Sequence, residues 1–173
     1  MIKLSCNNDL LFINLINFLE EKNVFIANQH KYFIKVDVIE KKEGIYLLIN
    51  KQIKLFKLPL NINNFFSYFF TIIKNENFSF FGLKYFPYQN LITKDKKKSF
   101  LTNIQNLIFF YLSIYDNGFD KENLYKIIWK KDKNISINKL DTHLTNLKNH
   151  LKNDLNFSIN FHSNNKNIKL IIN

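Results

Sequence analysis

The chain has few of the residues on which glycine-rich nucleotide sites and cysteine-based frameworks depend. Among its 173 residues there are 3 glycines, 2 prolines and 1 cysteine. The phosphate-binding loops of common nucleotide-dependent enzymes need several glycines close together, so the composition excludes most of these enzymes. The single cysteine, Cys6, excludes a disulfide framework and a multi-cysteine zinc site, and it is typical of a reducing compartment.

Long apolar runs are also missing. The longest, residues 65–73, has nine residues, about half of the ~20 that cross a bilayer. Residues 1–5 lack the basic start and the long apolar stretch of a secretory signal. We therefore expect a cytoplasmic protein that does not associate with membranes.

Arginine is absent, so all 25 basic residues are lysines, and the chain contains 28 asparagines. This bias is typical of an AT-rich bacterial genome. Against 14 acidic residues, the lysines still leave a formal net charge of +11. Up to residue 77 there are 10 lysines against 7 acidic residues, and beyond it 15 against 7. The excess predicts an anionic partner such as nucleic acid, bound by the C-terminal part.

The hydrophobic content of 46% predicts packed cores, and the patterning predicts an α+β protein with two domains, 1–75 and 78–173. In the first domain we expect a small α/β unit of strand, helix, three strands and helix. A helix begins at Asn8 or Asp9, and a second, capped by Asn61, spans Ile62–Ile73. The expected strands are Ile2–Cys6, Tyr32–Ile39, Ile45–Ile49 and Ile53–Phe56.

In the second domain we expect strands, three helices and a final hairpin. The helices begin at Thr102, at Asp120 and at Ser136, and the first ends at Asn117-Gly118. Apolar residues at helical spacing form a single stripe on the third helix. Three helices followed by a hairpin predict a winged helix. The expected strands are Phe80–Tyr85, Leu91–Thr93, Phe157–Phe161 and Ile168–Ile172. The second leads through the polar run Lys94–Ser99, in which the lysine-rich segment Lys94–Lys98 is interpreted as a solvated turn, with a docking patch as the alternative.

From Phe81 to Leu170 the chain resembles the OmpR/PhoB-type winged-helix domain of bacterial response regulators. The segment Leu140–Leu151, LDTHLTNLKNHL, resembles the recognition-helix pattern V-D-V-H-I-x-R-L-R-K-K-L. The chain departs from the family at Asn146 and Lys148, where the pattern has arginines, and at Ser163–Asn167, which replaces the glycines and the arginine of the wing. Supporting blocks are Phe81–Pro87, Leu91–Thr93, Phe100–Thr102, Lys121–Leu124 and Ile128-Trp129.

The first domain resembles a shortened, degenerate receiver. The acidic pair that holds Mg²⁺ in receivers is matched by Asn7-Asn8 or Asn8-Asp9, and the phosphoryl-accepting position is best matched by Asn50. Neutral amides neither assemble a divalent-ion site well nor accept a phosphoryl group. We therefore expect no phosphorylation, no metal and no cofactor, with Asp37 as the single rival acceptor.

The third helix carries the residues expected to contact DNA. Asparagine pairs with the N6/N7 edge of adenine and lysine neutralises phosphate, so a polar face flanked by cations suits a major groove. The alternative is a solvated face in an asparagine-rich protein. The predicted base-reading residues are Asn138, Thr142, Asn146 and Asn149, and those for the backbone or minor groove are Lys139, His143, Thr145, Lys148 and Lys166.

Two of these residues have specific alternatives. His143 is otherwise a half-buried helix histidine, and Lys166 is otherwise an exposed loop lysine. The other three histidines share no metal-ligand spacing, so no metal is expected. The aromatic residues around Phe109–Tyr111, Tyr125 and Trp129 have helical spacing, which favours core packing over base stacking.

Together these features predict a phosphorylation-independent transcription regulator that binds A·T-rich duplex DNA as a homodimer, with RNA polymerase as a candidate partner. The alternatives are a protein-interaction adapter and a low-specificity nucleoid protein. No carboxylate pair, nucleophile with a base, or oxyanion loop has catalytic spacing, so we do not expect an enzyme.

Overall fold

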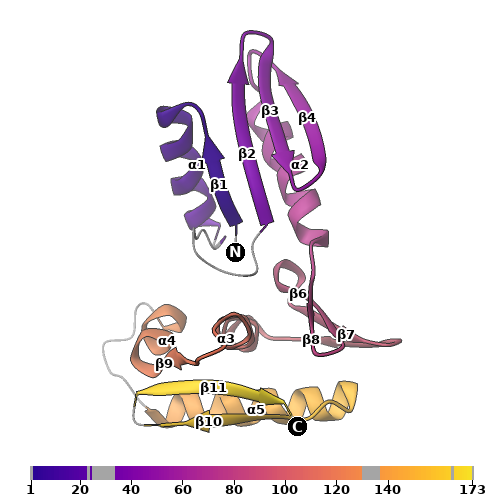
Figure 1. Ribbon diagram of the computed structural model, residues 1–173, viewed down its shortest axis with the longest axis vertical. Helices are drawn as coiled ribbons and strands as arrows, with labels where there is room; N and C mark the ends of the chain where they lie inside the picture. The colour runs from indigo at the N-terminus through magenta and orange to yellow at the C-terminus, as the bar shows by residue number, and fades with distance from the viewer. Residues whose placement is uncertain (1, 23, 25–33, 130–136, 165, 173) are drawn as a thin grey trace. The chain divides into compact units, whose positions relative to one another are not determined.

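The structure is a computed structural model that describes residues 2–22, 24, 34–129, 137–164 and 166–172. It has a mixed α and β fold, and the chain divides into two compact units, Met1–Glu76 (unit 1) and Asn77–Asn173 (unit 2) (Figure 1). None of the described helices combines the length and the apolar character needed to cross a bilayer.

In its described residues, unit 1 has one four-stranded sheet in the order β1-β2-β3-β4 and two helices. The β1 and β2 strands are parallel, and β2, β3 and β4 form an antiparallel meander. The elements are β1 (Ile2–Cys6), α1 (Asp9–Glu21), β2 (Ile34–Lys41), β3 (Gly44–Ile49), β4 (Gln52–Lys57) and α2 (Ile62–Asn75).

Alternating burial along the strands places the core on one face of this sheet. In β2, Ile34, Val36 and Val38 are buried, and β1 and β3 repeat the pattern. Leu15 and Leu19 of α1 and three phenylalanines of α2 pack against the same face. Both helices therefore cover one side of the sheet, and in the part of unit 1 that the structure describes no helix covers the other side.

The arrangement of unit 1 differs from the receiver fold that its sequence resembles. Receivers have a doubly wound parallel sheet with helices on both faces. Here the connections between β2 and β3 and between β3 and β4 are two-residue turns. A parallel pair needs a crossover of a dozen or more residues, so these turns force antiparallel pairing.

The part of unit 2 that the structure describes has two sheets and three longer helices. One sheet is an antiparallel meander in the order β5-β6-β7-β8, and the other has the order β10-β11-β9. The elements are β5 (Phe78–Phe80), β6 (Leu83–Phe86), the 3₁₀ turn η1 (Pro87–Gln89), β7 (Leu91–Lys94), β8 (Lys97–Phe100), α3 (Asn103–Ile114), β9 (Phe119–Asp120), α4 (Lys121–Ile128), α5 (Ile137–Leu155), β10 (Ile159–Ser163) and β11 (Asn167–Ile172).

One strand prediction and one turn prediction in unit 2 were wrong. The segment Phe80–Tyr85 is divided between β5 and β6, because Phe81 and Gly82 both have positive φ and form the turn between them. The run Lys94–Lys98 is not one solvated turn, because Lys94 belongs to β7 and Lys97 and Lys98 belong to β8. Asp95 and Lys96 form a tight turn, and the lysine-rich segment that follows pairs with β7 as β8.

The ends of the helices follow their capping residues. Thr102 and Gln105 form a capping box at the start of α3, and the Asp120 side chain accepts a hydrogen bond from Asn123 N at the start of α4. The α3 helix ends at Ile114, before the predicted Asn117-Gly118. The predicted cap of the third helix, Ser136, lies outside the described residues.

The α3 helix is the central element of unit 2. Its residues from Ile108 to Ile114 are buried, which confirms core packing for Phe109, Phe110 and Tyr111. The Tyr85 hydroxyl donates a hydrogen bond to Asn106 Oδ1 at 2.7 Å, and Asn106 Nδ2 donates to Pro87 O at 3.0 Å. Burial raises the pKa of Tyr85 well above its usual value, so the hydroxyl stays protonated and remains a donor.

We predict that Tyr85→Phe lowers the free energy of unfolding of unit 2 by about 1–2 kcal/mol, because it leaves buried Asn106 Oδ1 without its donor. Urea denaturation followed by circular dichroism measures the change. Tyr88→Phe is the matched control, because the buried Tyr88 hydroxyl has no hydrogen-bond partner among the residues that the structure describes. Its removal is expected to leave the stability unchanged or to raise it, and equal losses in the two variants would contradict the prediction.

Candidate nucleic-acid interface

The α5 helix separates an apolar face from a polar face. Leu140, Leu144, Leu147, Leu151 and Leu155 are buried and follow helical spacing. The opposite face carries short amides and hydroxyls that are exposed. They are the four predicted base-reading residues together with Thr145, namely Asn138, Thr142, Thr145, Asn146 and Asn149.

The polar face is available for an external ligand. Among the described residues, the side chains of Asn138, Asn146 and Asn149 have no hydrogen-bond partner. The Thr142 hydroxyl donates its proton to the Asn138 carbonyl at 2.9 Å. In this rotamer the hydroxyl oxygen can accept a hydrogen bond from a ligand, and it can donate one only after the hydroxyl rotates. The asparagine amides can each donate and accept, which is the pattern that an adenine edge requires.

One flank of this face is an aromatic cluster at the end of α4. The His143 ring lies 5.6 Å from the Trp129 ring, and Lys139 Nζ lies 4.8 Å from the centre of the same ring. Tyr125 packs on Trp129 at 4.5 Å. Lys139 and His143 are thus half-buried neighbours of Trp129 rather than fully extended side chains. By their positions on the helix, both residues lie next to the predicted base-reading face.

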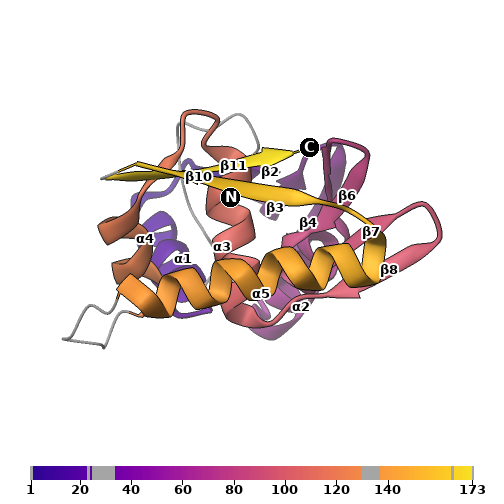
Figure 2. The same cartoon turned by 90° about the horizontal axis from the view of Figure 1, so that it is seen from below.

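The other flank is joined to the β10–β11 hairpin, which runs alongside α5 (Figure 2). Lys148 is exposed, and its Nζ donates a short hydrogen bond to Asn160 Oδ1 on β10. This contact uses one of three ammonium donors, so two remain for a phosphate. The Asn160 side chain was not among the predicted site residues, because its proximity to Lys148 depends on the tertiary packing of α5.

Lys166 lies at the turn of the hairpin and is exposed. Its backbone is fixed, because its N–H donates to Asn164 Oδ1 at 3.1 Å and its carbonyl accepts from Lys121 N at 2.9 Å. Within the described part of the chain, its ammonium has no partner. A fixed backbone with a free cation is suited to phosphate or minor-groove contact.

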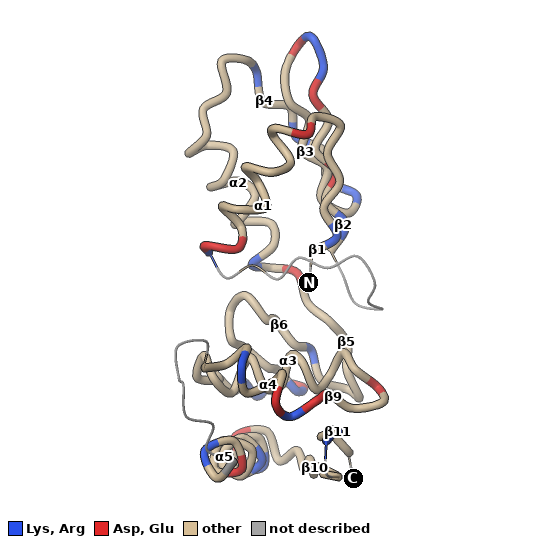
Figure 3. The backbone as a smooth tube through the Cα atoms, turned by 90° about the vertical axis from the view of Figure 1, so that its left-hand side faces the viewer, with Lys and Arg blue, Asp and Glu red and all other residues tan. Residues whose placement is uncertain are grey.

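Charges of both signs lie along α5, as Figure 3 shows. Asp141 is exposed two helical turns before Lys148 and on the same side, and Lys152 is exposed one turn after it. Neither was among the predicted site residues, although their helical positions place them there. Asp141 repels phosphate, so the approach of a polyanion is expected to be governed by the lysines and the hairpin.

His150 has a structural role rather than a surface one. Its Nδ1 lies 3.2 Å from Gln105 Oε1 and its Nε2 lies 2.9 Å from Asp154 Oδ2. Ser99 Oγ of β8 donates to the same carboxylate at 2.8 Å. These bonds join α5 to the capping box of α3 and to β8, and so they help to set the orientation of the polar face.

The positions of unit 1 that match the phosphorylation site of a receiver do not come together. Asn7 and Asn8 hydrogen-bond to Glu40, whereas Asn50 N donates to Lys35 O at 2.9 Å. Lys35 and Glu40 are five residues apart on β2, which corresponds to about 16 Å. Because β3 runs antiparallel to β2, Asn50 lies at the opposite end of the sheet from Asn7, and no receiver-like pocket forms from these residues.

Asp37 lies on the uncovered face of the sheet and is bound by its neighbours. Its Oδ1 accepts from Ser5 Oγ at 2.5 Å, and its Oδ2 lies 2.9 Å from Lys35 Nζ. Partial burial opposes ionisation, but the hydrogen bond from Ser5 and the charges of Lys35 and Lys3 outweigh it and lower the pKa of Asp37.

The described residues contain no group of three or more histidine, cysteine, aspartate or glutamate side chains that is able to hold a metal ion. Comparison of the chain with protein-family models and with curated proteins finds no match. The geometry of the two units therefore carries the functional argument.

The lowered pKa of Asp37 predicts a pH dependence of stability. A depressed native pKa contributes stability that is fully present above the pKa of the unfolded chain, and this contribution is lost as the pH falls through the lower native pKa of Asp37. Asp37→Asn should therefore lower the melting temperature at pH 7 and make the melting temperature of unit 1 less sensitive to acid. Glu21→Gln, at the exposed end of α1, controls for the loss of one carboxylate. Parallel pH profiles for wild type and Asp37→Asn would contradict the assignment.

Proposed function

We propose that unit 2 is a winged-helix domain of OmpR/PhoB type that binds duplex DNA and that the protein is a transcription regulator. In this proposal α5 is the recognition helix and the β10–β11 hairpin is the wing. The observation that carries it is the exposed polar face of α5, bordered on one side by Lys139 and on the other by Lys148 and the hairpin.

The dimensions and chemistry of α5 fit this role. Its 19 residues span about 28 Å, and a major groove about 12 Å wide admits a helix. Asn138, Asn146 and Asn149 would then read base edges, while Lys148 and Lys166 would contact phosphates or the minor groove. Because the chain has no arginine, no residue of this face presents the fork that pairs with guanine.

Regulation by phosphorylation is not part of the proposal. The residues that match the receiver site are Asn7, Asn8 and Asn50, which are neutral amides at opposite ends of the sheet of unit 1. We therefore propose a constitutive regulator in which unit 1 serves contacts with other proteins or with a second copy.

Two other functions fit parts of the same evidence. A low-specificity nucleoid protein would use the lysines alone, and an adapter would use the polar face of α5 for a protein. Competition between one selected duplex and bulk DNA separates the three functions. A regulator prefers its site by at least ~10³-fold, a nucleoid protein shows almost no preference, and an adapter has no DNA affinity.

The affinity for DNA should fall steeply with salt, because each lysine–phosphate contact releases counterions. Lys148→Ala is expected to weaken binding to all sequences alike and to reduce the slope of log K against log salt by about one. Fluorescence anisotropy over a salt series measures both effects. The control is Lys42→Ala in the exposed turn between β2 and β3 of unit 1, and equal slopes for the two variants would remove Lys148 from the interface.

The preferred site should be rich in A·T pairs, because asparagine pairs with adenine and a good bidentate contact discriminates by about 1–3 kcal/mol. Asn146→Arg should shift one position of the motif toward guanine and leave the other positions intact. Selection from a random duplex pool tests both statements, with Asn14→Arg on the exposed side of α1 as the control. A G·C-rich motif for the wild type, or an unchanged motif for Asn146→Arg, would show that this face does not read bases.

A further inference from the structure

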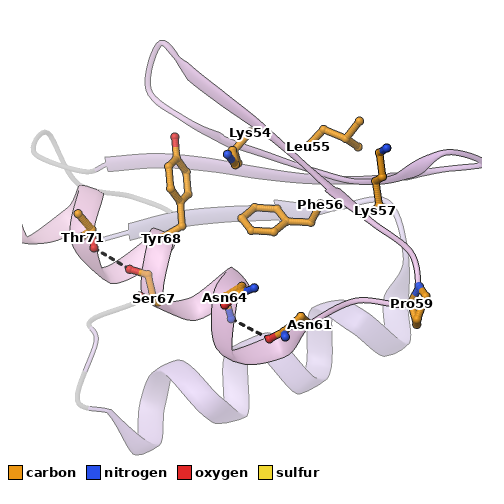
Figure 4. Close-up of a pocket in the computed structure, with 10 residues that line it drawn as sticks. All are labelled: Lys54, Leu55, Phe56, Lys57, Pro59, Asn61, Asn64, Ser67, Tyr68 and Thr71. Carbon is orange, nitrogen blue, oxygen red and sulfur yellow. Dashed lines mark hydrogen bonds between the residues drawn. The ribbon is translucent and has the colours of Figure 1, made fainter.

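Unit 1 has a groove that the proposed DNA-binding function does not use. It lies between β4 and α2 and has a volume of about 590 Å³. Its floor and walls come from consecutive residues of β4 and from one side of α2 (Figure 4). We call it the β4–α2 groove. The lining residues are Lys54, Leu55, Phe56, Lys57, Pro59, Asn61, Asn64, Ser67, Tyr68 and Thr71.

One wall of this groove is a free backbone edge. The sheet order β1-β2-β3-β4 leaves β4 paired to β3 alone among the described strands. Asn50 N donates a hydrogen bond to Lys35 O, so the backbone groups of Asn50 point toward β2. In an antiparallel pair this direction repeats at every second residue, so the backbone groups of Leu48 and Tyr46 also point toward β2.

The residues between them, Ile45, Leu47 and Ile49, therefore direct their backbone groups toward β4, where they meet Phe56, Lys54 and Gln52. The alternate residues of β4 direct their N–H and C=O groups away from the sheet. These residues are Ile53, Leu55 and Lys57. An extended segment laid along the edge would find a row of unpaired donors and acceptors.

The side chains around the edge differ on its two sides. On the groove side, Lys54 Nζ lies 5.7 Å from the centre of the Tyr68 ring. Asn64 and Ser67 stand on α2 opposite β4, and none of the ten lining residues is a carboxylate. On the other side of the sheet, Ile53 is 65% exposed and Leu55 is 36% exposed. Side chains of an added strand would alternate between a cationic, hydroxyl-lined groove and an apolar surface.

We propose that the β4–α2 groove binds an extended acidic segment of another protein by adding it as a strand to the edge of β4. Acidic side chains of the segment face Lys54 and the hydroxyls of α2, and its alternate apolar side chains cover Ile53 and Leu55. The main-chain bonds supply affinity, and the charge selects the partner.

Charge decides against a second copy of this chain as the occupant. Pairing of two β4 edges would bring Lys51, Lys54 and Lys57 of both copies together, and like charges on paired strands are destabilising. A nucleic acid is also disfavoured, because it does not offer the alternating amide donors and carbonyl acceptors that complete a strand edge.

The test uses the full chain and fluorescein-labelled octapeptides of alternating Val and Glu or of alternating Val and Lys. Anisotropy titrations should show a preference for the Val-Glu peptide of about tenfold or more. Lys54→Glu should abolish this preference, whereas Lys42→Glu, the same charge change outside the groove, should leave it within about twofold. Equal binding of the two peptides, or equal effects of the two variants, would overturn the proposal.

A second variant tests the strand addition itself. Leu55→Pro removes an N–H that β3 does not use, and proline is tolerated on an edge when its N–H side faces solvent. It should abolish binding of the Val-Glu peptide. Independently of any variant, hydrogen exchange of the wild type should show that the amides of Ile53 and Leu55 become protected when this peptide is added.

Unchanged exchange at these two amides under saturating peptide would overturn the proposal. So would protection of the Ile53 and Leu55 amides by duplex DNA in the absence of peptide, because the groove would then be a nucleic-acid site. Protection of the same amides that depends on protein concentration in the absence of peptide would point to a second copy as the occupant, and it would overturn the proposal as well.

Discussion

The burial of one leucine stripe determines the architecture of unit 2. The five leucines of this stripe on α5 are buried, and each contributes on the order of 1.5–3 kcal/mol of stability when it leaves water. The α5 helix contacts α3, β8 and β10. The helix can satisfy all these neighbours in only one rotation about its axis. That rotation turns the asparagines and threonines outward and places Lys148 against Asn160. The composition of the exposed face therefore follows from the packing of the buried one.

Polar bonds then remove the remaining freedom of this helix. His150 and Asp154 join α5 to Gln105 and Ser99, and the same Gln105 caps α3. The His150 side chain thus helps to orient the helix. Because these partners lie 45 and 55 residues apart in sequence, the bonds couple segments that local patterning treats as unrelated.

The sequence predicted most of what is local and missed what is not. Asn61 and Asp120 were correctly placed as helix caps, and of the two candidates Asn8 and Asp9 the structure shows Asn8 as the cap. Thr102, the residue at which the helix that became α3 was expected to start, is its cap. Each of these caps is a bond between residues three apart, which is why local patterning can find it. The division of Phe80–Tyr85 was missed, since it depends on an unusual positive φ at Phe81. The β8 strand was missed because its lysines are typical of a solvated loop, and it is a strand only because it pairs with β7. The sequence also did not show that Asn7 and Asn50 lie at opposite ends of the sheet of unit 1, because their separation depends on the antiparallel direction of β3 relative to β2.

The candidate site shows the same division between local and tertiary information. Helical spacing correctly predicted which residues of α5 are exposed, as for Asn146, and which are buried, as for Leu147. It did not predict that His143 and Lys139 pack around Trp129 or that Lys148 bonds to the hairpin, since those neighbours come from α4 and β10. The β4–α2 groove had no signal in the sequence, because its walls are two elements whose proximity arises on folding.

The exposed edge of β4 also has a consequence for how the protein behaves when it is concentrated. An unpaired edge with isoleucine and leucine beside it invites self-association into larger sheets, and natural proteins guard such edges with lysine. On β4 the protecting residues are Lys51, Lys54 and Lys57, and they oppose edge-to-edge pairing through their charge alone. Electrostatic repulsion has a range of about 10 Å at 0.1 M salt and about 3 Å at 1 M. The colloidal stability of the protein therefore depends on ionic strength. High salt screens the repulsion between the lysines of two β4 edges, and it also strengthens the attraction between their exposed isoleucine and leucine side chains.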